Sequence, residues 1–194
     1  MTEALSDSQH RQTTSQANNT KLGFWFFIGG EITLFSALIL MFIVFRVIHA
    51  ADFADFRAEL NMPLVGLNTL VLVTSSYLVV RSLRAVQRQR IRSGLYQLLI
   101  VLLLGTLFVG GQAYEWAGLF GNGVDVSSTF GSPFFIITGI HGTHGLIGLA
   151  WASFLLIEYG TGSMTDEHPI EIFGLYWHFV DIVWIILFSL IYLL

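Results

Sequence analysis

The stretch YWHFVDIVW, residues 176–184, opens an apolar run that continues to Leu194. A run of that length without a loop signal is typical of a transmembrane helix. Yet it carries His178 and Asp181, and residues at this spacing share one face of a helix. Ionisable side chains inside a membrane span are costly, so we expect both to face protein or water rather than lipid tails. The other helices of the chain should therefore pack against this polar stripe.

The composition predicts an all-α, polytopic membrane protein. Of the 194 residues 54% are hydrophobic and only 11% are charged, and the mean hydropathy is +0.70. The apolar runs are long and do not alternate as the strands of a membrane barrel would. The chain has no Cys, which excludes disulfides, thiolate metal ligands and covalently attached c-type haem. No phosphate loop, Ser-His-Asp order or basic nucleic-acid patch is visible, so we expect no nucleic-acid partner.

Five apolar runs predict a bundle of five transmembrane helices over residues 21–194. The polar residues 1–20 contain no signal-peptide core, and we expect a flexible N-terminal tail there. Loops are expected at residues 49–62, 81–92, 117–132 and 158–171. The spans are predicted at about residues 22–48, 63–80, 95–113, 133–157 and 172–194.

The distribution of Lys and Arg predicts an N-in/C-out orientation. With five spans the two termini lie on opposite sides of the membrane. If the N-terminus is cytoplasmic, seven of the nine basic residues lie inside, five of them arginines of residues 81–92. Only Arg46 and Arg57 then lie outside. A bacterial inner (plasma) membrane is the natural setting for this rule.

Polar residues at similar depths predict an intramembrane network. At a rise of about 1.5 Å per residue, Glu31, His144 and Asp181 fall roughly 14–16 Å into a core about 30 Å thick. Hydrogen bonds that lock the helices, a proton path and a metal site are three interpretations of such a layer. The candidate network consists of Glu31, Asn68, His141, His144, His178 and Asp181.

Other residues have simpler interpretations. Arg81, Arg84 and Arg88 could bind anionic lipid headgroups or act only as topology determinants. Glu115 is expected near solvent at the end of the third span. The glycines Gly105, Gly110 and Gly111 are expected to allow close helix packing.

Five stretches together resemble subunit III of the haem-copper oxidases, the cytochrome c oxidase subunit III family. The HGTHG and YWHFVDIVW stretches are the specific ones, and all five occur in family order over nearly all of residues 21–194. They are residues 21–31, PLVGLNT at 63–69, QAYE at 112–115, TGIHGTHG at 138–145, and residues 176–184. The chain is similar to the shorter, five-helix bacterial type.

The resemblance implies a subunit that carries no haem or copper itself and packs against oxidase subunits I and II and membrane phospholipids. Haem and copper would belong to the partner subunits. Glu31 matches the family's buried carboxylate in the first shared helix and is the candidate proton-related carboxylate. His141, His144, His178 and Asp181 match its intramembrane polar positions.

The resemblance favours subunit III of an aa3-type cytochrome c oxidase, a non-redox subunit that supports assembly, proton uptake and turnover stability of the oxygen-reducing, proton-pumping complex. Subunit III of a quinol oxidase and the related accessory protein of nitric oxide reductase are alternatives. An independent membrane transporter and a metal-dependent membrane enzyme are alternatives of a different class.

Overall fold

The protein is all-α in the part of the chain that the computed structural model describes, residues 2–57, 60–163 and 166–194. The elements are α1 (Thr2–Ile48), α2 (Ala50–Arg57), α3 (Met62–Gln87), α4 (Ile91–Gly121), α5 (Gly131–Gly160), α6 (His168–Phe188) and the π-helical turn η1 (Ser189–Leu193). Five helical segments are long and apolar enough to cross a membrane. They are Thr20–Ile48, Met62–Gln87, Ile91–Gly121, Gly131–Gly160 and His168–Leu193. The predicted five-span fold is thereby confirmed, and the orientation stays a prediction.

Two compact units make up the chain, residues 1–34 and residues 35–194. The first unit is the N-terminal part of α1, and its backbone is helical from Thr2 onward. The flexible tail is predicted at residues 1–20; Met1 lies outside the described residues, and the flexibility of the tail stays a prediction. The second unit holds the rest of α1 and all the other helices.

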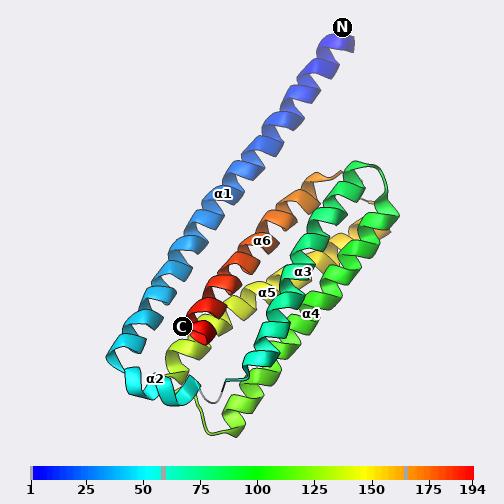
Figure 1. Cartoon of the computed structure of the whole chain (residues 1–194). Coiled ribbons are helices and arrows are strands. Elements are labelled where there is room, and N and C mark those ends of the chain that lie inside the picture. The colour runs from blue at the N-terminus through cyan, green and yellow to red at the C-terminus, as the bar shows by residue number, and fades with distance from the viewer. Residues whose placement is uncertain (1, 58–59, 164–165) are drawn as a thin grey trace. The chain divides into compact units, whose positions relative to one another are not determined.

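Helices α3 to α6 pack as a bundle in the second unit (Figure 1). Helix α3 contacts α4 and α6, and α5 contacts α4 and α6. The sixth helix is the most enclosed, because 56% of its most apolar stretch is buried, against 28–33% in α3, α4 and α5. The stretch that carries His178 and Asp181 is therefore the most enclosed span of the bundle, as its sequence indicates.

Trp177 of α6 fills a notch made by two glycines of neighbouring helices. A Cβ atom added at Gly148 of α5 would lie 2.6 Å from the Trp177 ring, and one added at Gly105 of α4 would lie 2.9 Å from it. The indole Nε1 donates a hydrogen bond of 2.9 Å to Ser75 Oγ of α3. One buried side chain thus touches three helices, and only glycine leaves room for it.

Helices α3 and α4 form a hairpin with a very short connection, residues 88–90. Its turn places Gln89 in the left-handed region, at φ 57°, and the Gln89 and Arg90 N–H groups bond back to Val86 and Ala85 carbonyls. Ser82 Oγ donates to Gly94 O at 2.9 Å and joins the two helices near the turn.

The predicted loop at residues 81–92 is therefore mostly helix. Helix α3 continues through Gln87, and α4 begins at Ile91. Residues 49–62, also predicted as a loop, contain α2. An apolar run ends where side chains become polar, whereas backbone hydrogen bonding continues beyond that point, so hydropathy underestimates helix length.

Candidate functional site

The predicted polar residues of the second unit occupy separate environments, and Asn68 joins two helices. Its Nδ2 donates a hydrogen bond of 2.9 Å to Phe108 O of α4. The amide rests against Gly111, where an added Cβ would lie 2.8 Å from it. Asn68 therefore fixes the distance and register between α3 and α4.

His178 of α6 bonds to α3. Its Nδ1 lies 2.6 Å from Ser76 Oγ, and which of the two groups donates depends on the tautomer of the ring. The imidazole is half-buried. Ser76 of α3 is thus the hydrogen-bond partner of His178 on the polar face of α6.

Asp181, one helical turn from His178, has a different environment. The residue is only 4% exposed. Neither carboxylate oxygen is in good hydrogen-bond geometry with a described residue, although the Ser76 hydroxyl, the partner of His178, is close enough to interact with the carboxyl group. A buried carboxyl group with so few hydrogen bonds is costly.

His141 and His144 lie one turn apart on α5 but face different neighbours. His141 is 1% exposed and stacks on the Trp184 ring, with centroids 5.1 Å apart. Neither of its ring nitrogens bonds to a group in the described residues. His144 Nδ1 lies 2.8 Å from Ile140 O of its own helix. The ring of Phe35 contacts both imidazoles.

Glu31 belongs to the first unit, while the other five network candidates belong to the second. Its membership of a common layer with them stays a prediction. Within residues 2–57, 60–163 and 166–194, no three His, Cys, Asp or Glu side chains gather closely enough to hold a metal ion. The metal-site interpretation therefore gains no support from the described residues.

Sequence reasoning missed a buried polar cluster, Gln112, Glu115 and Tyr192, which we call the Glu115 cluster. Tyr192 donates its hydroxyl to Glu115 Oε2 at 2.7 Å, and Gln112 Nε2 donates to the same oxygen at 3.2 Å. The prediction that Glu115 lies near solvent was wrong, because the residue is only 5% exposed. Helix α4 extends to Gly121, and the C-terminal turn η1 supplies Tyr192. The spacing of Gln112 and Glu115 on one helix face was the available signal.

Of the three arginines proposed to contact lipid headgroups, Arg81 and Arg84 lie on the last turns of α3 and Arg88 lies in the connection that follows, all with exposed side chains. The guanidinium of Arg81 lies 5.9 Å from the centroid of the Tyr77 ring, at the distance of a cation–π contact. Arg84 and Arg88 follow at helical spacing. Their contact with lipid stays a prediction.

The side-chain bonds of Asn68, His178 and Glu115 run between helices. They join α3 to α4, α6 to α3, and η1 to α4. This arrangement fixes helix positions, and it leaves His141 and Asp181 as the buried network candidates with polar atoms that no described residue satisfies.

Comparison with known proteins places these residues in a family context. A family model described as cytochrome c oxidase subunit III matches residues 1–194. The chain is 34% identical over 188 residues to a protein of Staphylococcus saprophyticus named probable quinol oxidase subunit 3, covering 94% of this chain and 92% of the relative. Relatives with the same name in Staphylococcus haemolyticus and Staphylococcus aureus are 33% and 34% identical, each covering 93% of this chain and 92% of the relative.

Proposed function

This chain belongs to the cytochrome c oxidase subunit III family of haem-copper oxidases, and we propose that it is the non-redox third subunit of an oxidase that takes its electrons from a quinol. Its five spans and its bacterial relatives make it a multi-pass protein of a bacterial plasma membrane. The assignment of a quinol as electron donor rests on the name of those relatives, probable quinol oxidase subunit 3. They are 33–34% identical to this chain over more than nine tenths of its length. The cytochrome c donor that the sequence favoured has less support than this alternative.

A structural role for the subunit is supported by its own residues. The sequence contains no Cys, and the hydrogen bonds of Asn68, His178 and Glu115 connect helices. We therefore assign the haem, the copper and the electron transfer to partner subunits I and II. In this proposal the present chain contributes stability of the assembled complex and, through Glu31, proton uptake.

Purification of the complex tests the proposal. The full chain, tagged at its C-terminus, is used to isolate its partners in mild detergent, and oxygen consumption is measured with a reduced quinol and with reduced cytochrome c. We expect a haem spectrum in the isolated complex and oxygen consumption with the quinol. Oxidation of cytochrome c without quinol oxidation would show that the complex is a cytochrome c oxidase. Recovery of the folded chain without any haem-containing partner would overturn the subunit assignment.

A further inference from the structure

One stripe along α6 stays open in the second unit. Within residues 170–187 the side chains that are not buried lie at positions 171, 175, 178, 182, 185 and 186. The first five of these positions follow one another at alternating steps of four and three residues, so they share one side of the helix. Ile182 and Ile185 are 58% and 45% exposed. We call Leu175, His178, Ile182 and Ile185 the outer stripe of α6.

Two further sides of α6 face α3 and α5. Trp177 bonds to Ser75 of α3 and packs on Gly148 of α5. One turn and a half further along, the indole Nε1 of Trp184 donates a hydrogen bond of 3.0 Å to Thr69 Oγ1 of α3. Both tryptophans therefore point away from the outer stripe and into the bundle.

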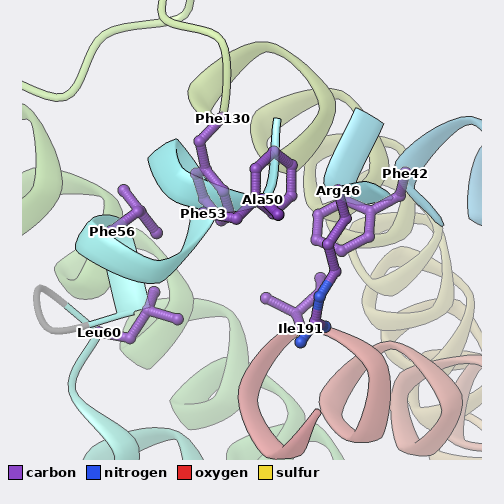
Figure 2. Close-up of a pocket in the computed structure, with 8 residues that line it drawn as sticks. All are labelled: Phe42, Arg46, Ala50, Phe53, Phe56, Leu60, Phe130 and Ile191. Carbon is purple, nitrogen blue, oxygen red and sulfur yellow. The ribbon is translucent and has the colours of Figure 1, made fainter. Parts of the chain in front are cut away.

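The second half of α1 covers another part of α6. Phe179 meets Phe35 of α1 edge-to-face, with ring centroids 6.0 Å apart. Beyond the end of α6, Arg46 of α1 donates a hydrogen bond of 2.7 Å to Leu190 O, and Figure 2 shows its side chain running toward Ile191. Helices α1, α3 and α5 thus leave the outer stripe as the open side of α6.

The spacing of the outer stripe is that of a seam between two helices. Steps of four and three residues keep side chains aligned along a neighbouring helix in left-handed packing, the commonest arrangement of membrane helices. Leu175, Ile182 and Ile185 are apolar, and such residues would suit lipid tails equally well. His178 is therefore the residue that decides between lipid and protein.

His178 lies deep in the membrane. At a rise of about 1.5 Å per residue, it is roughly 15 Å from His168, where the span His168–Leu193 begins. That distance is half of a hydrocarbon core about 30 Å thick. Lipid tails at this depth offer no hydrogen-bond partner, so a polar side chain there is expected to face protein.

The imidazole of His178 has one nitrogen to spare. Its Nδ1 is held by Ser76 Oγ at 2.6 Å, which is the only hydrogen bond of the ring to a described residue. The Ser76 hydroxyl also interacts with the Asp181 carboxyl group, so the Nδ1 edge of the ring is fixed toward α3. His178 Nε2 is not among the enclosed polar atoms without a partner in the described residues. This nitrogen is therefore accessible from the outer stripe.

We propose that one transmembrane helix of a partner oxidase subunit packs along the outer stripe of α6, and that a polar group of this helix bonds to His178 Nε2. The proposal rests on the assignment of this chain as an oxidase subunit. The apolar members of the stripe supply the packing, and His178 fixes the register of the two helices, as a single polar residue does in a helical seam.

Photo-crosslinking of the intact oxidase tests the docking surface. The sequence contains no Cys, so Ile182→Cys places one benzophenone label on the outer stripe. Leu103→Cys is the matched control, because Leu103 lies on α4 and is 60% exposed, close to the 58% of Ile182. After irradiation in the membrane, we expect Ile182→Cys to give an adduct with a haem-bearing subunit in several times the yield of Leu103→Cys.

Two further variants separate the bond to the partner from the bond within this chain. His178→Leu removes both bonds of the ring, whereas Ser76→Ala removes only the bond to Nδ1. We expect His178→Leu to weaken retention of this subunit in detergent roughly threefold to tenfold more than Ser76→Ala does. Native mass spectrometry of the purified complex measures the retention.

The outcomes distinguish this proposal from the subunit assignment. Adducts of Ile182→Cys only with lipid, with a second copy of this chain or with its own α1 would overturn the docking surface. Equal retention in His178→Leu and Ser76→Ala would overturn the bond to Nε2. Failure to recover any haem-bearing partner would overturn the subunit assignment and the docking surface together.

Discussion

Glu115 and Asp181 are two buried carboxyl groups of one helical bundle, yet they differ in their hydrogen bonds. Glu115 on α4 accepts hydrogen bonds from Tyr192 and Gln112 at Oε2, although its Oε1 has no partner among the described residues. Neither Asp181 oxygen is in good hydrogen-bond geometry with a described residue, and only the Ser76 hydroxyl interacts with that carboxyl group. Both are about equally buried, at 5% and 4% exposed. Burial alone therefore does not tell whether a carboxyl group stabilises a helix bundle. What decides it is whether a neighbouring helix brings a donor to the same level.

The largest effect is expected from Glu115→Leu. The change removes the shared acceptor of the Tyr192 hydroxyl and the Gln112 amide, which then have each other as partners, at a cost of about 1–3 kcal/mol. We expect a marked decrease in the free energy of unfolding of the full chain, measured in mixed detergent. Glu115→Gln is the control, since its carbonyl still accepts from Tyr192. Wild-type stability in Glu115→Leu would show that the cluster does not hold η1 to α4.

Tyr192→Phe should have a smaller effect. It removes one hydroxyl and leaves Glu115 with Gln112 as a donor, so we expect a loss of about 1 kcal/mol in the free energy of unfolding. Tyr114→Phe, at a tyrosine that is 70% exposed, provides the comparison and should be neutral. The inference fails if the two substitutions have the same effect.

The bond between His178 and Ser76 should contribute about as much as one ordinary hydrogen bond. His178→Ala, Ser76→Ala and the double variant form a cycle, in which we expect a coupling energy of roughly 0.5–1.5 kcal/mol. Unfolding of the chain in detergent supplies the three free-energy differences. A coupling energy indistinguishable from zero would mean that the two groups do not bond in the membrane protein.

The smallest effect on the chain itself is expected at Asp181. Asp181→Leu removes only a weak interaction with the Ser76 hydroxyl, so the free energy of unfolding of the isolated chain should change by less than about 1 kcal/mol. We expect the loss in the oxidase instead, as a lower amount of this subunit in the purified complex, because the substitution changes the packing of α6. Full occupancy with abolished turnover would point to a direct chemical role.

The sequence was enough to locate the five spans, since long apolar runs report directly on membrane insertion. It also predicted packing roles for Gly105 and Gly111, which Trp177 and Asn68 now explain. At Gly110 an added Cβ would meet nothing within 4 Å. A glycine in a span therefore does not always mark a close contact between helices. Apolar patterning does not report how far each helix is rotated about its own axis.

The partners of polar residues could not be predicted for that reason. Tyr192 is 77 positions from Glu115, and Ser76 is 102 positions from His178. Each pair depends on the rotation and the depth of two helices at once. Asn68 was predicted as a member of the polar network, but its acceptor is a backbone carbonyl, Phe108 O, and every residue carries such a group. A side-chain pattern cannot identify it.

The connection between α3 and α4 has only three residues, 88–90. We expect it to couple the insertion of the two helices into the membrane. A chain emerging from the ribosome cannot leave α3 in the bilayer and α4 outside for long, since their shared turn is too short to span any distance between them. We therefore expect the translocon to release the two spans as one helical hairpin, with Ser82 already bonded to Gly94. A force-sensitive arrest peptide placed at successive points behind α4 should then record one pulling event for the pair, whereas two separate events would show independent insertion.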